Sequence, residues 1–346
     1  MLEQFCRIWP EADIFTHAYK PEAVTDVIRS HKVNTTFINK LPGAQSNCQK
    51  YLPMMPAALR RLDLNDYDLI ISSESGPIKG VRKPEHATHI CYCHTPMRYL
   101  WDMYEEYFRN TSVMGKTAMI MFRNYLRKYD LKSAGSVDHF IANSNFVAER
   151  IKRIYGRDST VIYPPVNTGL FADGEYDKKD YYLFVGQLIP YKQPGLAIEA
   201  CRRLNRHLIV VGDGDQRREL EDRSGEAITF TGRTSGEALR KLYAEARALI
   251  FPGVEDFGIV PLEAQAAGTP VIALRAGGAM ETVVEGSTGL FFDRQEVDSL
   301  CSAIEEFESI EKSFDPKVMS DHAALFSEER FRNEIRHFVE SNVVQV

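Results

Sequence analysis

The sequence predicts an α/β protein whose parallel sheets form two doubly wound domains. Short runs rich in β-branched and aromatic residues alternate with longer helix-like runs along most of the 346 residues, and this alternation is the pattern of strand–helix–strand units. Residues 167–180 follow a Pro-Pro pair and are rich in Gly and Asp, as expected for a linker. A chain of this length can hold two domains of about 150 to 180 residues.

The predicted strands form one group on each side of this linker. In the first half they are residues 12–17, 34–40, 67–73, 88–93 and 139–144. In the second half they are residues 181–187, 207–213, 227–233, 248–253 and 269–274. We therefore expect a first domain of residues 1–168, a second domain of residues 175–326, and mostly helical structure after residue 293.

Composition excludes several classes of function. The net charge of −6 and the pI of about 5.9 argue against nucleic-acid binding. No run approaches the roughly 18 apolar residues of a membrane span, and the first residues lack the basic and apolar regions of a signal peptide, so a cytoplasmic location is expected. The six cysteines lack the spacing of a metal site.

Charge is unevenly distributed between the two halves. Residues 1–166 hold 22 Lys and Arg against 17 Asp and Glu, whereas residues 167–346 hold 20 against 31. Segment 116–132 interleaves basic and apolar residues. One interpretation is a surface helix with a solvated basic face, because Met119, Phe122 and Leu126 have core spacing. The other is a peripheral contact with the cytoplasmic face of a membrane, or with a pyrophosphoryl-lipid acceptor.

Residues 251–270 are the most informative stretch. Glu255 and Glu263 stand eight positions apart, and Gly258 and Pro261 between them mark the start of an apolar, Ala-rich helix. The N–H groups and positive dipole end of such a helix favour a diphosphate or a sugar oxygen. One carboxylate can then hold a sugar and the other a ribose.

This stretch resembles the Glu-x7-Glu signature of retaining glycosyltransferases of the family 4 type. These enzymes have the GT-B fold, in which two Rossmann-like domains face a cleft. Matching segments follow in the expected order at 185–200, 211–215, 230–233, 277–283 and 286–292. In the amino half, residues 91–102, 142–151 and 161–167 look like the bacterial mannosyltransferases that build O-antigen and other surface polysaccharides.

The resemblance implies a donor site in the second domain. Lys192 is expected to grip the donor diphosphate, Glu255 to bind sugar hydroxyls, and Glu263 to accept hydrogen bonds from the ribose diol. The other expected donor-side residues are Gly186, Gln187, Arg233, Phe257, Gly258, Ile259, Gly277 and Gly278. The family usually has Arg where this chain has Gln187, so weaker stabilisation of the leaving group is expected, for which Arg233 or Arg98 could compensate.

The resemblance also implies catalytic and acceptor residues in the first domain. His94 follows a predicted strand, and its counterpart binds the transferred sugar near the 6-hydroxyl, so the expected catalytic residues are His94, Lys192 and Glu255. Arg98, Tyr99 and Asp102 are expected on the acceptor side.

Two terminal segments are interpreted from the same resemblance. The family opens with an apolar strand and a Gly-rich loop, but this chain begins at a helix-like segment, so the central strand of the first sheet is expected to be missing. Either the chain is a truncated or misassigned product or another segment fills the gap, since unpaired ladder groups are costly. The C-terminal helix, residues 327–346, is expected to pack back on the first domain.

Two rival interpretations of short motifs are weaker. The triplet Asp213-Gly214-Asp215 could be a metal-binding DxD motif, but it follows an apolar strand as a tight turn would, and no metal is expected. An NAD-dependent oxidoreductase would need Gly-x-Gly-x-x-Gly, which residues 211–219 lack.

The function expected from the sequence is a retaining glycosyltransferase. The expected reaction moves α-mannose from GDP-mannose to a lipid-linked or oligosaccharide acceptor in surface-polysaccharide synthesis, with no cofactor beyond this co-substrate. The alternatives are a UDP-sugar donor and a weakly active or non-catalytic relative that binds sugar nucleotides.

Overall fold

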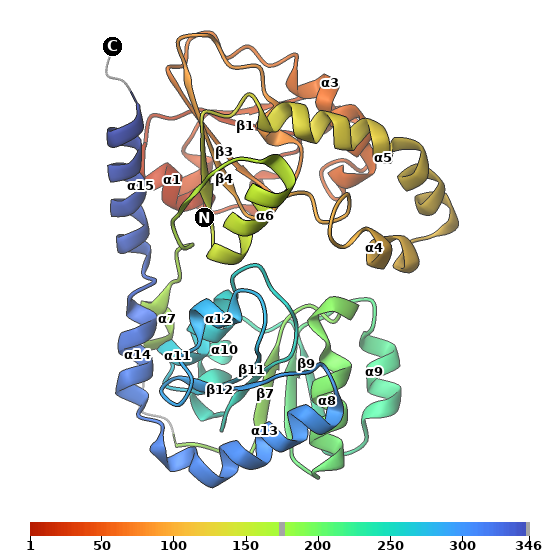
Figure 1. The fold of residues 1–346 in the computed structure, drawn as a ribbon, viewed down its shortest axis with the longest axis vertical. Helices are drawn as coiled ribbons and strands as arrows, with labels where there is room; N and C mark the ends of the chain where they lie inside the picture. The colour runs from red at the N-terminus through yellow and green to blue at the C-terminus, as the bar shows by residue number, and fades with distance from the viewer. Residues whose placement is uncertain (173–176, 344–346) are drawn as a thin grey trace. The chain divides into compact units, whose positions relative to one another are not determined.

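The computed structural model describes residues 1–172 and 177–343, which divide into two compact units (Figure 1). One unit comprises residues 1–163 and the chain from Arg332 onward, and the other comprises Pro164–Phe331. Residues 173–176 of the predicted linker lie outside the described residues. The α/β class with two Rossmann-like parallel sheets is confirmed.

The second unit is built on a six-stranded parallel sheet. Its strands are β7 (Tyr182–Val185), β8 (Leu208–Val211), β9 (Ile228–Gly232), β10 (Leu249–Phe251), β11 (Val271–Leu274) and β12 (Gly289–Phe292). Their spatial order is β12-β11-β10-β7-β8-β9. The direction of winding therefore reverses between β7 and β10, and a crevice for ligands forms at the carboxyl ends of strands at such a switch point.

Helices cover both faces of this sheet. They are α7 (Thr168–Ala172), α8 (Pro194–Arg203), α9 (Arg217–Ser224), α10 (Gly236–Glu245), α11 (Ile259–Ala266), α12 (Ala279–Thr282), α13 (Val297–Ile310) and α14 (Pro316–Ala324). Side chains alternate along β7: Tyr182 and Phe184 belong to the core cluster that includes α8 and α13, whereas Leu183 belongs to the cluster that includes α10 and α11. This period of two buries both faces of the strand, as in other parallel sheets.

The first unit contains two separate parallel sheets. Strands β3 (Leu69–Glu74), β4 (Thr88–Cys93), β5 (His139–Ala142) and β6 (Thr160–Val161) form one, and β1 (Ile14–Thr16) pairs only with β2 (Val33–Thr35) in the other. Within the described residues, no strand joins the two sheets. Every residue of β1 and β2 is only half-buried, whereas five of the six residues of β4 are buried.

The helices of the first unit include one from the end of the chain. They are α1 (Leu2–Ile8), α2 (Asp26–Arg29), α3 (Met55–Leu59), α4 (Tyr104–Asn110), α5 (Val113–Ala134), α6 (Asn145–Tyr155) and α15 (Glu328–Asn342). Arg332 of α15 donates a hydrogen bond to Gln4 Oε1 at 2.5 Å, and the Phe338 ring lies 6.1 Å from the His139 ring. The part of α15 from Arg332 onward therefore belongs to the core of the first unit.

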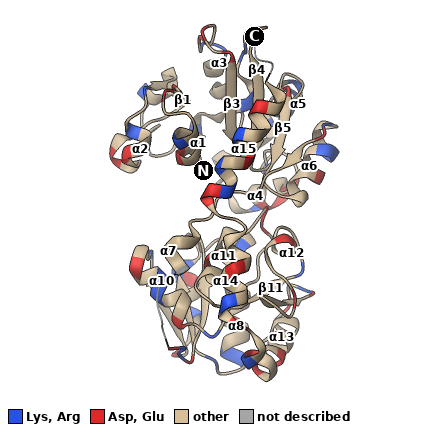
Figure 2. Ribbon diagram, turned by 90° about the vertical axis from the view of Figure 1, so that its left-hand side faces the viewer, with Lys and Arg blue, Asp and Glu red and all other residues tan. Residues whose placement is uncertain are grey.

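Charged residues lie mainly in helices and loops rather than in strands (Figure 2). Among the described strands, Glu74 at the end of β3 is the only Asp, Glu, Lys or Arg. Within the same residues, no helix combines the length and the apolar character that a membrane span requires.

Two strand predictions need correction. The predicted strand 34–40 ends at Thr35, and Phe37–Lys40 is a 3-10 helix (η2) whose Ile38 is fully buried. A short apolar run with β-branched residues can form either a strand or a short helix, and tertiary packing determines which of the two forms. The strands β6 and β12 were not predicted, since β6 has two residues and β12 begins with glycine.

Candidate functional site

The loops that follow β7 and β10 meet at the switch point of the second unit. The loop after β7 contains a 3-10 turn, η5 (Pro190–Lys192), and Lys192 Nζ forms an ion pair with Glu255 Oε1 from the loop after β10. The side chains are 19% and 14% exposed. The structure thus brings together the two residues predicted to hold the diphosphate and the sugar.

The close approach of these two loops depends on Gly253. A Cβ atom there would lie 2.9 Å from both Lys192 Cα and Tyr191 O, which is closer than real Cβ atoms come to other atoms. Glycine has no Cβ, so the two backbones can touch. A larger residue at position 253 would push Lys192 away from Glu255.

The segment of Gly277 and Gly278, two of the expected donor-side residues, supports Glu255 from the other side. The Gly278 N–H donates a hydrogen bond to the Glu255 carbonyl oxygen at 2.8 Å. A Cβ at Gly278 would lie 2.2 Å from Phe257 Cα, so this position also requires glycine. The turn after β11 therefore fixes the backbone of the Glu255 loop.

Helix α11 begins where the sequence predicts. Gly258 precedes the helix with a φ of 95°, Pro261 lies in its first turn, and Glu263 lies further along the same helix. Phe257 is buried and Ile259 is exposed. The N–H groups of the first turn lack partners within the helix itself, so they can bind an anionic or polar ligand oxygen.

Glu263 is oriented by a tyrosine that sequence reasoning missed. The Tyr243 hydroxyl, from α10, donates a hydrogen bond to Glu263 Oε2 at 2.8 Å. Burial raises the pKa of Glu263, and the hydrogen bond from Tyr243 opposes that rise. Tyr243 is fully buried. No local motif marks it, because the contact spans twenty positions of sequence.

The remaining predicted donor residues lie around the same edge of the sheet. Gln187 is exposed after β7, and Arg233 is exposed after β9. A Cβ at Gly186 would make only ordinary contacts, the nearest at 3.7 Å, so packing does not demand glycine there. The loop after β7 instead approaches Gly212, which directly follows β8. A Cβ at Gly212 would lie 1.8 Å from the Gly186 carbonyl oxygen, so glycine is required there.

Asp213 and Gly214 lie in the irregular loop after β8, and the turn lies slightly later than predicted, closed by the hydrogen bond from the Arg217 N–H to the Gly214 carbonyl oxygen at 3.0 Å. Asp213 Oδ1 accepts a hydrogen bond from the Gly214 N–H at 2.9 Å, and both aspartates are exposed. Among residues 1–172 and 177–343, no group of three or more His, Cys, Asp or Glu side chains is placed to hold a metal ion.

His94 lies in the first unit, directly after β4. Its Nε2 is 2.9 Å from Ser73 Oγ, and its ring packs edge-on against Tyr92 at 5.3 Å. Burial lowers the pKa of His94 to about 4. The imidazole is therefore neutral near pH 7 and acts there as a hydrogen-bonding group rather than as a cation.

The residues predicted on the acceptor side are partly engaged within the first unit. Asp102 accepts hydrogen bonds from Arg150 Nε at 2.6 Å and from Arg153 Nη2 at 2.9 Å, which tie it to α6. The Tyr99 hydroxyl lies 3.1 Å from Met97 Sδ, and burial raises the pKa of Tyr99. Arg98 is half-buried. The Asp102 carboxylate thus has two structural ion pairs in addition to its predicted role.

A buried charge cluster, Glu74, Lys79 and Asp130, lies beside His94 and was also missed by sequence reasoning. Lys79 Nζ is 2.9 Å from Glu74 Oε1 and also forms an ion pair with Asp130 Oδ1. Trp101 Nε1 donates to Asp130 Oδ2 at 2.7 Å. The Glu74 carbonyl oxygen accepts from the His94 N–H at 2.8 Å. The cluster therefore ties together β3, α5 and the segment that carries His94.

Comparisons with known proteins identify the class that this fold and site define. Residues 169–321 match the family model described as glycosyl transferases group 1, and residues 10–170 match glycosyltransferase family 4. The chain therefore consists of two glycosyltransferase-family domains and has the GT-B fold.

The similar individual proteins belong to the same class. The D-inositol 3-phosphate glycosyltransferase of Mycolicibacterium smegmatis is 27% identical over 55% of this chain and 50% of its own length. The chain spans about half the length of the curated relatives it matches. Sucrose-phosphate synthase from Thermosynechococcus elongatus aligns with a TM-score of 0.77 over 98% of this chain and 90% of its own, at 20% identity. Anabaena HepE in complex with UDP-glucose aligns with a TM-score of 0.70 over 98% and 96%, at 19% identity.

Proposed function

We propose that this protein is a retaining glycosyltransferase that moves α-mannose from GDP-mannose to a lipid-linked or oligosaccharide acceptor in surface-polysaccharide synthesis. The observation that carries the proposal is the Lys192–Glu255 pair at the switch point of the second sheet, next to the start of α11. The resemblance of residues 91–102 to mannosyltransferases favours mannose.

The proposed reaction requires a positive charge that stabilises the leaving group, and it does not require a nucleophile from the protein. As the bond between the sugar C1 and the diphosphate oxygen breaks, negative charge develops on the departing diphosphate, and the Lys192 ammonium group stabilises it. The acceptor oxygen bonds to C1 on the same face, and its proton passes to the leaving phosphate. Glu255 orients the sugar hydroxyls and Glu263 the ribose, which places C1 for attack.

A UDP-sugar donor is the second candidate. It is supported by the Anabaena protein of similar fold, whose structure holds UDP-glucose. The two candidates share the diphosphate and ribose contacts and differ in the base and the sugar. A direct comparison of donors therefore separates them.

A donor panel tests both candidates. The purified protein is mixed separately with GDP-mannose, UDP-glucose, UDP-N-acetylglucosamine and ADP-glucose, and thermal shift and slow donor hydrolysis are measured. We expect stabilisation and hydrolysis with GDP-mannose alone, because ligand binding to the folded state raises the melting temperature. Mannose 1-phosphate, which lacks the nucleoside, is the control.

Preference for a uridine donor would replace the GDP-mannose assignment. Absence of any response to all four donors would contradict glycosyl transfer from a nucleotide sugar by this chain.

We further propose that Tyr243 positions Glu263 for the donor ribose. In Tyr243→Phe the ring remains, but the hydrogen bond to Glu263 Oε2 is lost, and a bond to a charged acceptor contributes about 1.5 kcal/mol. We expect the KM for the donor to rise roughly tenfold with kcat largely kept. Tyr181→Phe is the matched control, because its hydroxyl bonds to the Leu242 carbonyl oxygen instead. An unchanged donor KM in Tyr243→Phe would remove this role.

We also propose that α5 makes a peripheral contact with the membrane surface. Val113, Met114, Ile120 and Met121 are between 62% and 84% exposed. The exposed Lys128 and Lys132 lie further along the same helix. Exposed apolar residues combined with lysines favour an anionic membrane surface, where a lipid-linked acceptor would be found.

A further inference from the structure

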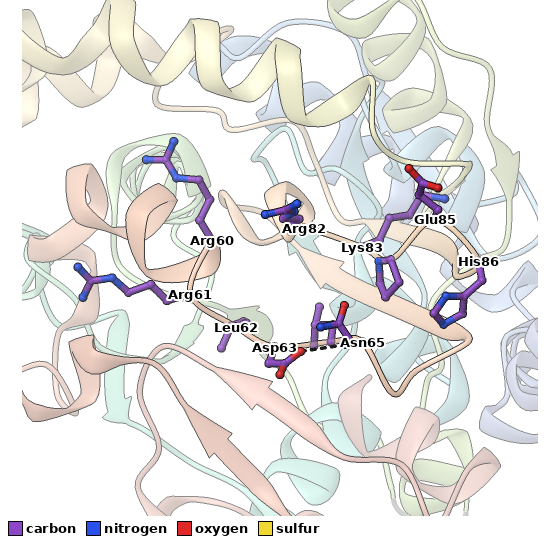
Figure 3. Close-up of a pocket in the computed structure, with 11 residues that line it drawn as sticks. Arg60, Arg61, Leu62, Asp63, Asn65, Arg82, Lys83, Glu85 and His86 are labelled. Atoms are coloured by element: carbon purple, nitrogen blue, oxygen red, sulfur yellow. Dashed lines mark hydrogen bonds between the residues drawn. The ribbon is translucent and has the colours of Figure 1, made fainter.

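A basic pocket lies at the amino ends of β3 and β4 in the first unit (Figure 3). It has a volume of about 520 Å³ and is formed by residues 60–65, which precede β3, and residues 82–86, which precede β4. Figure 3 shows Arg60 and Arg61 on one side and Arg82, Lys83 and His86 on the other. His94 follows the opposite end of β4, roughly 20 Å away at about 3.3 Å per residue. The pocket is therefore separate from the predicted acceptor residues.

The two loops of the pocket are held in place by the core. Leu59, Leu64 and Val81 are buried in one apolar cluster, so the residues flanking Arg60 and Arg82 are anchored together. Lys83 Nζ binds Asp138 Oδ2 at 2.7 Å and the Ala87 carbonyl oxygen at 2.8 Å. The second loop is thereby fixed at its base, and the pocket exists before any ligand binds.

The charges in the pocket are only partly compensated. Arg61 stacks on Phe37 at 5.0 Å, and Lys83 is paired with Asp138. Within the part of the chain that the structure describes, neither Arg60 nor Arg82 forms a side-chain hydrogen bond or an ion pair. Asp63 and Glu85 also line the pocket, but the cationic side chains outnumber these two carboxylates (Figure 3). In the described residues neither carboxylate forms an ion pair with Arg60 or Arg82, so two guanidinium groups from separate loops border one cavity. A planar guanidinium donates two parallel hydrogen bonds to phosphate oxygens, which a compact ammonium cannot do.

We propose that this pocket binds the phosphate group of a ligand, with Arg60 and Arg82 as the principal donors. The site is additional to the sugar-nucleotide site and does not depend on it, since it lies in the other unit of the chain. The polar rim excludes an apolar ligand, and the open side of the pocket admits either a free phosphate compound or a lipid headgroup.

Calorimetric titration with inorganic pyrophosphate tests the site in solution. The donor site also binds a diphosphate in the proposed function, so the titration is repeated with Lys192→Ala. We expect a binding component that persists in Lys192→Ala and weakens about tenfold or more in Arg60→Gln/Arg82→Gln, because charge-assisted hydrogen bonds are lost. Arg218→Gln, an exposed arginine of α9, is the matched control and should bind as the wild type does.

Flotation with vesicles tests the lipid source of the same phosphate chemistry. Phosphatidylcholine vesicles with and without phosphatidic acid are compared for the wild type, the double variant and Arg218→Gln. If the double variant, unlike Arg218→Gln, loses phosphatidic-acid-dependent flotation but keeps pyrophosphate binding, the ligand is a lipid headgroup. If it loses pyrophosphate binding but keeps flotation, the ligand is a free phosphate compound. If the double variant matches Arg218→Gln in both assays, or the wild type binds neither probe, the proposal is overturned.

Discussion

Lys192→Ala is expected to lower kcat/KM by about 10²- to 10³-fold, the range for removal of one group that stabilises developing negative charge. The ammonium group pairs with Glu255 before a donor binds, so it already lies where the diphosphate is proposed to sit. The variant also leaves a partly exposed Glu255 without its partner, which water can solvate. We therefore expect only a small change in melting temperature.

The measurement is initial transfer or hydrolysis with the donor that the panel selects. Lys312→Ala, an exposed lysine of the second unit, controls for loss of positive charge. If Lys192→Ala retained the kcat/KM of the wild type, Lys192 could not be the group that stabilises the leaving diphosphate. A large fall in the melting temperature would instead show a structural role.

Lys79→Met is expected to give the largest loss of stability, about 3–5 kcal/mol, the cost of leaving a buried charge without its partner. Glu74 and Asp130 are both buried, and burial raises the pKa of Glu74. Methionine fills similar space but leaves two carboxylates facing each other. Because a protonated carboxyl carries no charge, the loss should be smaller at about pH 5 than at about pH 8.

Thermal and urea unfolding measure this effect, with the first unit followed by Trp9 and Trp101 fluorescence. Lys132→Met, an exposed lysine of α5, is the control and should unfold as the wild type does. Adding Glu74→Gln and Asp130→Asn to Lys79→Met should recover part of the loss. Equal stability of Lys79→Met and the wild type at about pH 8 would show that the buried cluster is not charged.

The second unit was the easier half to predict from sequence. Apart from the edge strand β9, its strands are apolar runs such as residues 208–211 and 271–274, because both faces of the sheet are covered by helices. Its key site residues are also near landmarks in sequence, since Glu255 and Glu263 flank the start of one helix and Lys192 follows the first strand. The local sequence pattern and the proximity of these residues to strand ends were therefore enough to predict this unit and its site residues.

The missed features depend on contacts between residues far apart in the chain. Lys79 meets Asp130 across 51 positions, and Arg60 and Arg82 come from loops that only the parallel arrangement of β3 and β4 brings together. A buried lysine and a surface lysine look alike in sequence. The strand prediction for residues 36–40 was wrong for a different reason, since their apolar pattern fits a short helix as well as a strand.

The division of the first unit into two sheets makes its stability uneven. The β1–β2 pair has three residues in each strand, and an isolated two-stranded pair is marginally stable in water. It can open by breaking its own few ladder bonds and the contacts of Phe15 and Asp13 with Tyr67, while β3–β6, the buried cluster and the His94 contacts stay intact. Amide hydrogens on β1 and β2 should consequently exchange with solvent through local opening, at a lower free energy than those on β4, which require the whole unit to unfold.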